Sequence, residues 1–430
     1  MATKISSPPA AADAMPTSKV LGDVDLLGEI LRRVDSPSTL VRAALVSRRW
    51  LRAASARDFL RRFRALHPPR LIGFYVSGDC VPRPEFVPMP APAPPHPPDR
   101  ELSAAQRRAS TRSGFDAFPE FSSTVWDCWD GRVLFDFTET VHGSRRFGVR
   151  DPLRHPDRGV TELPPPPPTW PQPECPHAML FPDDSDGDAA CYRLHLRHSG
   201  ATVSATVGVL RSGAWSVHCS AEAVLPAPPE RIPMLTTLAA GKIYTVAVVG
   251  YVLGLDMAAA RFFVVELPAG VAYEYYGNLV PCRGGGGGGS ALYLVHLKGD
   301  RLCVWLRRRM DEHGAGDGEW VLRDAVSLRE TCGHLVEQGL EPAAGHAAVA
   351  SVVGVGDDAK FVFLELHASG VFVYMHFGSR KVEKVYQRDP DNDEITLVYP
   401  CSMAWLPVFP ALLDEGESEP EPLREEKASS

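Results

Sequence analysis

The chain has 430 residues and a formal net charge of −8, with 40 prolines and 36 glycines. A chain of this length fits one small domain together with a large one. The negative net charge gives no whole-chain basis for nucleic-acid binding, which needs a basic surface. The glycine and proline content favours a turn-rich β body with additional disordered stretches.

The cysteine spacing and the hydropathy pattern are typical of a soluble intracellular protein. The nine cysteines include no C-x-x-C pair, so neither a zinc site nor a disulfide framework is indicated. Residues 1–19 lack an apolar core of signal-peptide length. The longest apolar run, residues 243–255, is interrupted by Gly250 and Gly254 and is too short to span a bilayer. We therefore expect no membrane segment and a location in the cytoplasm, the nucleus or both.

Residues 20–67 show a helical pattern, whereas residues 1–19 are rich in alanine, proline and serine and are expected to be disordered. Asp23 is placed to cap a first helix, and Ser36 followed by Pro37 marks the start of a second. Ser47 is placed to cap a third helix. Apolar residues recur with helical spacing in this segment: Leu26, Leu27, Ile30, Leu31 and Val34, then Leu40, Val41, Ala44 and Leu45, then Trp50 and Leu51, then Phe59, Phe63 and Leu66.

These four short helices carry more apolar surface than one small core needs. A unit of fewer than about fifty residues is marginally stable alone, and partners often complete such a core. The surplus predicts a partner-binding surface. Residues 20–66 hold ten Lys/Arg and five Asp/Glu, a net charge of +5, which could meet an acidic partner. Residues 414–430 have a net charge of −5 and are expected to form a disordered acidic tail.

Residues 68–413 follow the pattern of a β domain. Strand–turn–strand units recur about 50 to 70 residues apart, near the length of a four-stranded propeller blade. They begin at Gly131, Cys191, Gly241, Ala291 and Phe361. We expect a β-propeller of about six blades, with proline-rich loops at 82–98 and 164–171, and a β-sandwich is the alternative. Strands at 71–76 and 395–399 are placed to pair and close the ring.

The N-terminal pattern resembles an F-box. It reads LGDVDLLGEILRRV from Leu21, followed by Leu40 and by VSRRW from Val46 to Trp50. The order, the spacing and the tryptophan match this motif over about 45 residues. One departure is Gly22, where the family usually has proline. It should loosen the entry into the first helix without removing its apolar face.

The remaining chain resembles the plant F-box proteins that carry a C-terminal kelch-like propeller. The match is carried by Gly131-Arg-Val-Leu, by Asp151-Pro-Leu with Leu163-Pro-Pro, by Gly241-Lys-Ile-Tyr and by Leu255-Asp-Met. The resemblance implies a non-catalytic subunit of an SCF-type ubiquitin ligase, in which the F-box binds a Skp1-like adaptor joined to a cullin and the propeller binds a protein substrate. The adaptor surface is expected to include Leu21, Leu26, Leu27, Ile30, Leu31, Leu40, Val46 and Trp50.

Two other functions stay open: an F-box scaffold or regulator that delivers no substrate, and an enzyme with a polar site on the propeller axis. No hydrolase or metalloprotease motif is present, and we expect no catalytic residue, cofactor or metal. The acidic stretch 183–188 resembles part of a calcium loop, but Ala189 and His195 stand where glycine and glutamate are needed. His195 and His198 would point to opposite faces of a strand.

Overall fold

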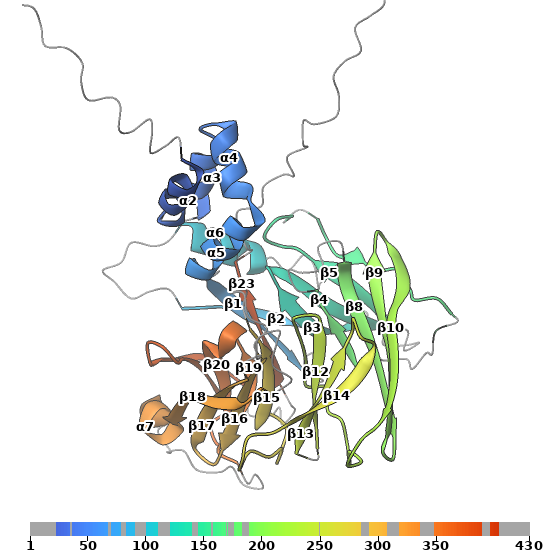
Figure 1. Ribbon diagram of the computed structural model, residues 1–430. Coiled ribbons are helices and arrows are strands. Elements are labelled where there is room, and N and C mark those ends of the chain that lie inside the picture. The colour runs from blue at the N-terminus through green and yellow to red at the C-terminus, as the bar shows by residue number, and fades with distance from the viewer. Residues whose placement is uncertain are drawn as a thin grey trace, which may run out of the picture. The chain divides into compact units, whose positions relative to one another are not determined.

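A computed structural model of the chain (Figure 1) describes residues 23–34, 37–67, 70–78, 83–90, 100–110, 121–139, 145–155, 158–168, 170, 176–182, 189–248, 250–284, 292–307, 318–335, 348–388 and 396–403. The sequence features at residues 1–19, Leu21, 183–188 and 414–430 lie outside the described residues. The chain divides into two compact units. The described part of the first ends at His67, and the second comprises Pro69–Ala404.

The described part of the first unit contains four helices, namely α2 (Val24–Arg32), α3 (Pro37–Ala44), α4 (Arg48–Ser55) and α5 (Arg57–Leu66). The Asp23 carboxylate accepts hydrogen bonds from the amides of Asp25 and Leu26, at 2.9 and 3.2 Å. The Ser47 hydroxyl accepts one from the Trp50 amide at 3.3 Å. These caps satisfy amides that the first helical turn leaves unpaired. The core between the helices consists of Leu27, Leu31, Leu40, Ala44, Ala54, Phe59 and Phe63.

The second unit is a six-bladed β-propeller, which confirms the predicted architecture and excludes the β-sandwich. Five blades are four-stranded antiparallel sheets and the sixth has three strands. The strands are β1 (Leu71–Gly78), β2 (Glu85–Pro88), β3 (Phe121–Trp129), β4 (Arg132–Glu139), β5 (Arg145–Arg150), β6 (Thr161–Glu162), β7 (Ala178–Leu180), β8 (Ala189–Ser199), β9 (Thr202–Arg211), β10 (Ala214–Val224), β11 (Thr236–Ala239), β12 (Lys242–Ala247), β13 (Tyr251–Asp256), β14 (Arg261–Glu266), β15 (Leu279–Arg283), β16 (Leu292–Lys298), β17 (Arg301–Arg307), β18 (Trp320–Ser327), β19 (Ala350–Val355), β20 (Phe361–Leu366), β21 (Val371–His376), β22 (Lys381–Gln387) and β23 (Thr396–Ser402).

The innermost strands contact one another around the ring in the order β3, β7, β11, β15, β19 and β23. The ring closes because β23, from the C-terminal end of the propeller, pairs with β1, from its N-terminal end, and Tyr75 lies opposite Tyr399. This pairing confirms the closure predicted from the two terminal strands. It also leaves β1 paired on both of its edges, by β2 and by β23, so that no edge of this strand is exposed.

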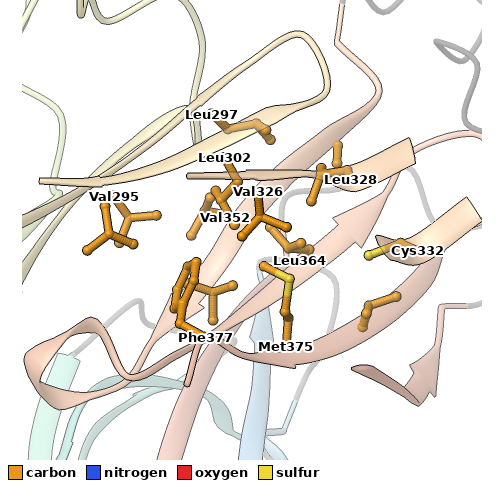
Figure 2. Packing of buried hydrophobic residues seen from close by; sticks show 14 of the residues in the cluster. Val295, Leu297, Leu302, Val326, Leu328, Cys332, Val352, Leu364, Met375 and Phe377 are labelled. Carbon is orange, nitrogen blue, oxygen red and sulfur yellow. The ribbon is translucent and has the colours of Figure 1, made fainter. Parts of the chain in front are cut away.

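Apolar side chains between neighbouring blades form the core of the propeller. The largest cluster lies between the β15–β18 and β19–β22 blades. Figure 2 shows Val326, Leu364 and Met375 of this cluster pointing into the space between the two sheets. Inner strands such as β16 and β20 are therefore buried on both faces, which explains why they are apolar at nearly every position. At Gly254 the ring of Phe263 lies where a Cβ would stand, so this position accepts only glycine without rearrangement.

The proline-dense stretch 82–98 differs from its prediction as a loop, because β2 occupies part of it and pairs with β1. Pro88 is the last residue of this outer strand, where a missing amide hydrogen removes no interior ladder bond. The helix α6 (Arg100–Ser110) follows, and the Gln106 side-chain amide donates to the carbonyls of Ile72 and Met89 at 3.0 and 2.9 Å. Two short helices, α7 (Leu328–Cys332) and η2 (Gly333–Leu335), follow β18, and η3 (Asp357–Ala359) follows β19.

Candidate functional site

The helical unit carries apolar side chains on its surface as well as in its core. On α2, Leu27 and Leu31 are fully buried, whereas Leu26 and Ile30, one position earlier, are 45% and 39% exposed. Residues four apart lie on one face of a helix. The helix α2 therefore presents two adjacent apolar stripes, of which one packs inward and the other faces solvent.

The same arrangement recurs on α3. Leu40 and Ala44 are buried, whereas Val41 is exposed and Leu45 and Val46 are 80% and 66% exposed. Hydrogen bonds from the amides of Leu45 and Val46 to the carbonyls of Val41 and Ala43 continue the last turn of the helix. We refer to the exposed residues Leu26, Ile30, Val41, Leu45 and Val46 as the docking face. Exposed apolar side chains gathered on so small a unit are typical of an interaction surface.

The residues predicted to contact an adaptor fall into three groups. Leu26, Ile30 and Val46 belong to the docking face. Leu27, Leu31 and Leu40 lie in the core of the unit and support that face from beneath, and Trp50 is half-buried against the same core. Leu21 lies outside the described residues.

The propeller holds a cluster of charged residues on its axis. Asp127 lies near the end of β3, Arg283 is the last residue of β15, and Asp357 follows β19. Three steps separate β3 from β15 in either direction around the ring of six innermost strands, so the two strands face each other across the axis. An ion pair between Asp127 and Arg283 therefore spans the centre of the propeller.

This axial network is closely packed. The Arg283 Nη2 donates to both carboxylate oxygens of Asp127, at 3.0 and 3.2 Å, and its Nε lies 3.9 Å from Asp357 Oδ1. Its guanidinium carbon lies 4.2 Å from the centre of the Trp129 ring, a favourable cation–π arrangement. The amide of Phe181, directly after β7, donates to Asp127 Oδ2 at 2.8 Å. Four blades thus meet at one end of the axis.

A sequence model of the family described as F-box protein AT5G49610-like, beta-propeller, matches residues 124–409, which are 286 of the 430 residues. The chain belongs to this family of F-box β-propeller proteins. The resemblance to plant F-box proteins with a C-terminal propeller is thereby confirmed. The matched region begins within β3 and extends past β23, so it includes the axial network.

Comparisons with individual proteins add little to this assignment. A search of curated proteins found no match. A chain of the nidogen/laminin complex is 10% identical, with 77% of this chain and 100% of that chain covered, at a TM-score of 0.38. A protein from Lactobacillus plantarum is 12% identical, with 61% of this chain and 68% of that chain covered, at a TM-score of 0.35. A protein of unknown function from Bacteroides thetaiotaomicron is 11% identical, with 65% of this chain and 63% of that chain covered, at a TM-score of 0.36.

The described part of this F-box β-propeller protein contains no group of three His, Cys, Asp or Glu side chains that could hold a metal ion. His195 is buried on β8 and accepts a hydrogen bond from Arg193 Nε at 2.8 Å, while His198 is exposed. Within the described ranges, no helix is long and apolar enough to cross a bilayer.

Two features of this family member were not predicted from the sequence. The exposure of Leu45 was missed because helical spacing identifies an apolar stripe but not which stripe faces solvent. The axial network was missed because Asp127 and Arg283 are 156 positions apart and lie in blades that face each other across the ring. A signal was present in Arg283, a charged residue at the end of an otherwise buried strand.

The axial network predicts a pH effect on the stability of the propeller. Desolvation raises the pKa of Asp357 from 3.8 to about 6, and the attraction of Arg283 only partly opposes this. Between about pH 4 and pH 6 the Asp357 carboxylate binds more protons in the folded protein than in the unfolded chain. The contribution of Asp357 to the free energy of unfolding therefore falls as pH rises. We expect Asp357→Asn to be more stable than the wild type at pH 7 and the difference to disappear near pH 4.

Urea unfolding of both proteins at pH 4, 5, 6 and 7 measures this effect. The exposed carboxylate of Glu230 provides a control, since Glu230→Gln should follow the wild-type curve. A difference between Asp357→Asn and the wild type that is constant over this pH range would show that Asp357 does not titrate as described.

Proposed function

We propose that this chain is the substrate-recruiting subunit of an SCF-type ubiquitin ligase. Residues 20–67 act as the F-box and bind a Skp1-like adaptor, which joins the chain to a cullin. The propeller binds the target protein. The main support for this proposal is the docking face on the helical unit. This unit belongs to a chain of an F-box β-propeller family.

The division of the chain into two units supports separate roles for them. The helical unit has too few residues to bury all of its apolar side chains, and a partner that covers the docking face would remove that surface from water. Leu21, Leu26, Ile30 and Val46 would contact the adaptor directly. Leu27, Leu31, Leu40 and Trp50 would hold the helices that present them.

A subunit of this kind needs no catalytic residue of its own. Holding a target beside an enzyme on another subunit raises the effective concentration of the target's lysines at that enzyme. Binding to the adaptor and binding to the target are then both required, and neither involves a chemical step in this chain.

Capture from a plant extract tests the proposal, with the whole chain and residues 68–430 as baits. We expect the whole chain to retain a cullin together with a Skp1-like protein, and residues 68–430 to retain neither. Proteins captured equally by both baits are the candidate targets. Two results would contradict the proposed function: residues 68–430 retain the cullin, or the whole chain fails to retain it.

A further inference from the structure

The charges of the helical unit are distributed unevenly around the docking face. Residues 36–57, which include α3 and α4, contain no Asp or Glu. The arginines of these two helices are all exposed, namely Arg42, Arg48, Arg49 and Arg52. Three of the five acidic residues in residues 20–66, Asp23, Asp25 and Glu29, lie at or on α2, where Asp23 caps the helix and Glu29 pairs with Arg32 and Arg33, and Asp58 lies on α5.

Arg42 lies beside the most exposed part of the docking face. It precedes Leu45 and Val46 by three and four residues, the spacing that places side chains on one side of a helical turn. Neither Arg42 nor Arg52 forms an ion pair with a described residue, so their charges are not neutralised within this part of the chain. The apolar end of α3 therefore lies in a positive field.

We infer that the partner of the docking face is an apolar groove with a carboxylate-rich rim, and that this rim lies opposite the α3–α4 corner. The inference rests on the proposed function, since it assigns a charge pattern to the adaptor that the docking face binds. Apolar side chains at the centre of an interface supply affinity, while charges at its rim steer the encounter and determine its orientation. An acidic rim would complement the arginines, whereas a basic rim would repel them.

This inference predicts that association depends strongly on salt. Exposed charges are screened over about 10 Å at 0.1 M ionic strength and over about 3 Å at 1 M. The association rate of the whole chain with a purified plant Skp1-like adaptor should therefore fall by about tenfold or more between low and high salt. The dissociation rate, which depends on apolar contacts at the centre, should change little.

A pair of charge reversals tests where the rim lies. Arg42→Glu and Arg62→Glu change the net charge equally, but Arg62 is exposed on α5, outside the docking face. We expect Arg42→Glu to slow association by about tenfold at low salt, and Arg62→Glu by less than about twofold. Circular dichroism of both variants would check that the helices remain formed.

The outcomes separate the inference from the proposed function. Equal slowing by the two variants, or an association rate that does not depend on salt, would contradict the inferred acidic rim. Neither result would contradict adaptor binding itself. Failure of the wild-type chain to bind the adaptor at any salt concentration would overturn the proposed function itself.

Discussion

Replacing Arg283 with alanine is expected to destabilise the propeller by about 3–5 kcal/mol. The side chains of Arg283 and Asp127 are 13% and 11% exposed, so their ion pair is largely screened from water. Removing the arginine leaves the Asp127 carboxylate buried without its counter-charge, and Asp357 loses its neighbouring cation. A single domain is typically stable by only about 5–15 kcal/mol, so the loss would be a large fraction of the total.

Urea unfolding followed by tryptophan fluorescence measures this loss. Arg380→Ala is a matched control, because Arg380 pairs with Asp324 at 2.7 Å but its side chain is 49% exposed. Surface ion pairs of this kind contribute about 1 kcal/mol or less. A loss for Arg283→Ala no larger than that for Arg380→Ala would show that the axial network does not hold the blades together.

The parts of the fold predicted from the sequence are those that local chemistry or regular spacing along the chain marks. Gly131 and Gly241 each have a positive φ, 74° and 70°, and stand in the turns directly before β4 and β12. Their conformational freedom is what made them markers of strand units. The recurrence of strand units about 50 to 70 residues apart predicted the ring, and the strands at its two ends predicted its closure.

The parts that could not be predicted depend on contacts between distant segments. Leu26 and Leu27 are adjacent and equally apolar, yet one is 45% exposed and the other is fully buried. Only the packing of the other helices decides between them. The strand at β2 was missed for a similar reason, because pairing with β1 overrides the local tendency of a proline-rich stretch to form a loop.

Introducing acidic residues into the docking face is expected to abolish adaptor binding without unfolding the chain. Leu45 and Val46 are the most exposed residues of this face, so Leu45→Asp with Val46→Asp disturbs little of the core. Burying a large apolar side chain contributes about 1.5–3 kcal/mol. Losing two of them, and placing carboxylates in a desolvated interface, should weaken binding by on the order of a hundredfold or more.

Substitution of the buried leucines would be a poorer test, because a loss of adaptor binding could then result from unfolding of the helical unit. Leu27→Ala removes a fully buried side chain and should cost about 2–5 kcal/mol of stability in a unit with a small core. Leu66→Asp is the appropriate control, because Leu66 is 62% exposed at the end of α5 and does not belong to the docking face. We expect this variant to bind the adaptor as the wild-type chain does.

Calorimetric titration of a purified plant Skp1-like adaptor into the whole chain, into Leu45→Asp with Val46→Asp and into Leu66→Asp tests the central claim most directly. We predict saturable binding by the wild type and by Leu66→Asp, and no measurable heat for the double variant at the same concentrations. Undiminished binding by a correctly folded double variant would show that the adaptor binds elsewhere or that this helical unit does not act as an F-box.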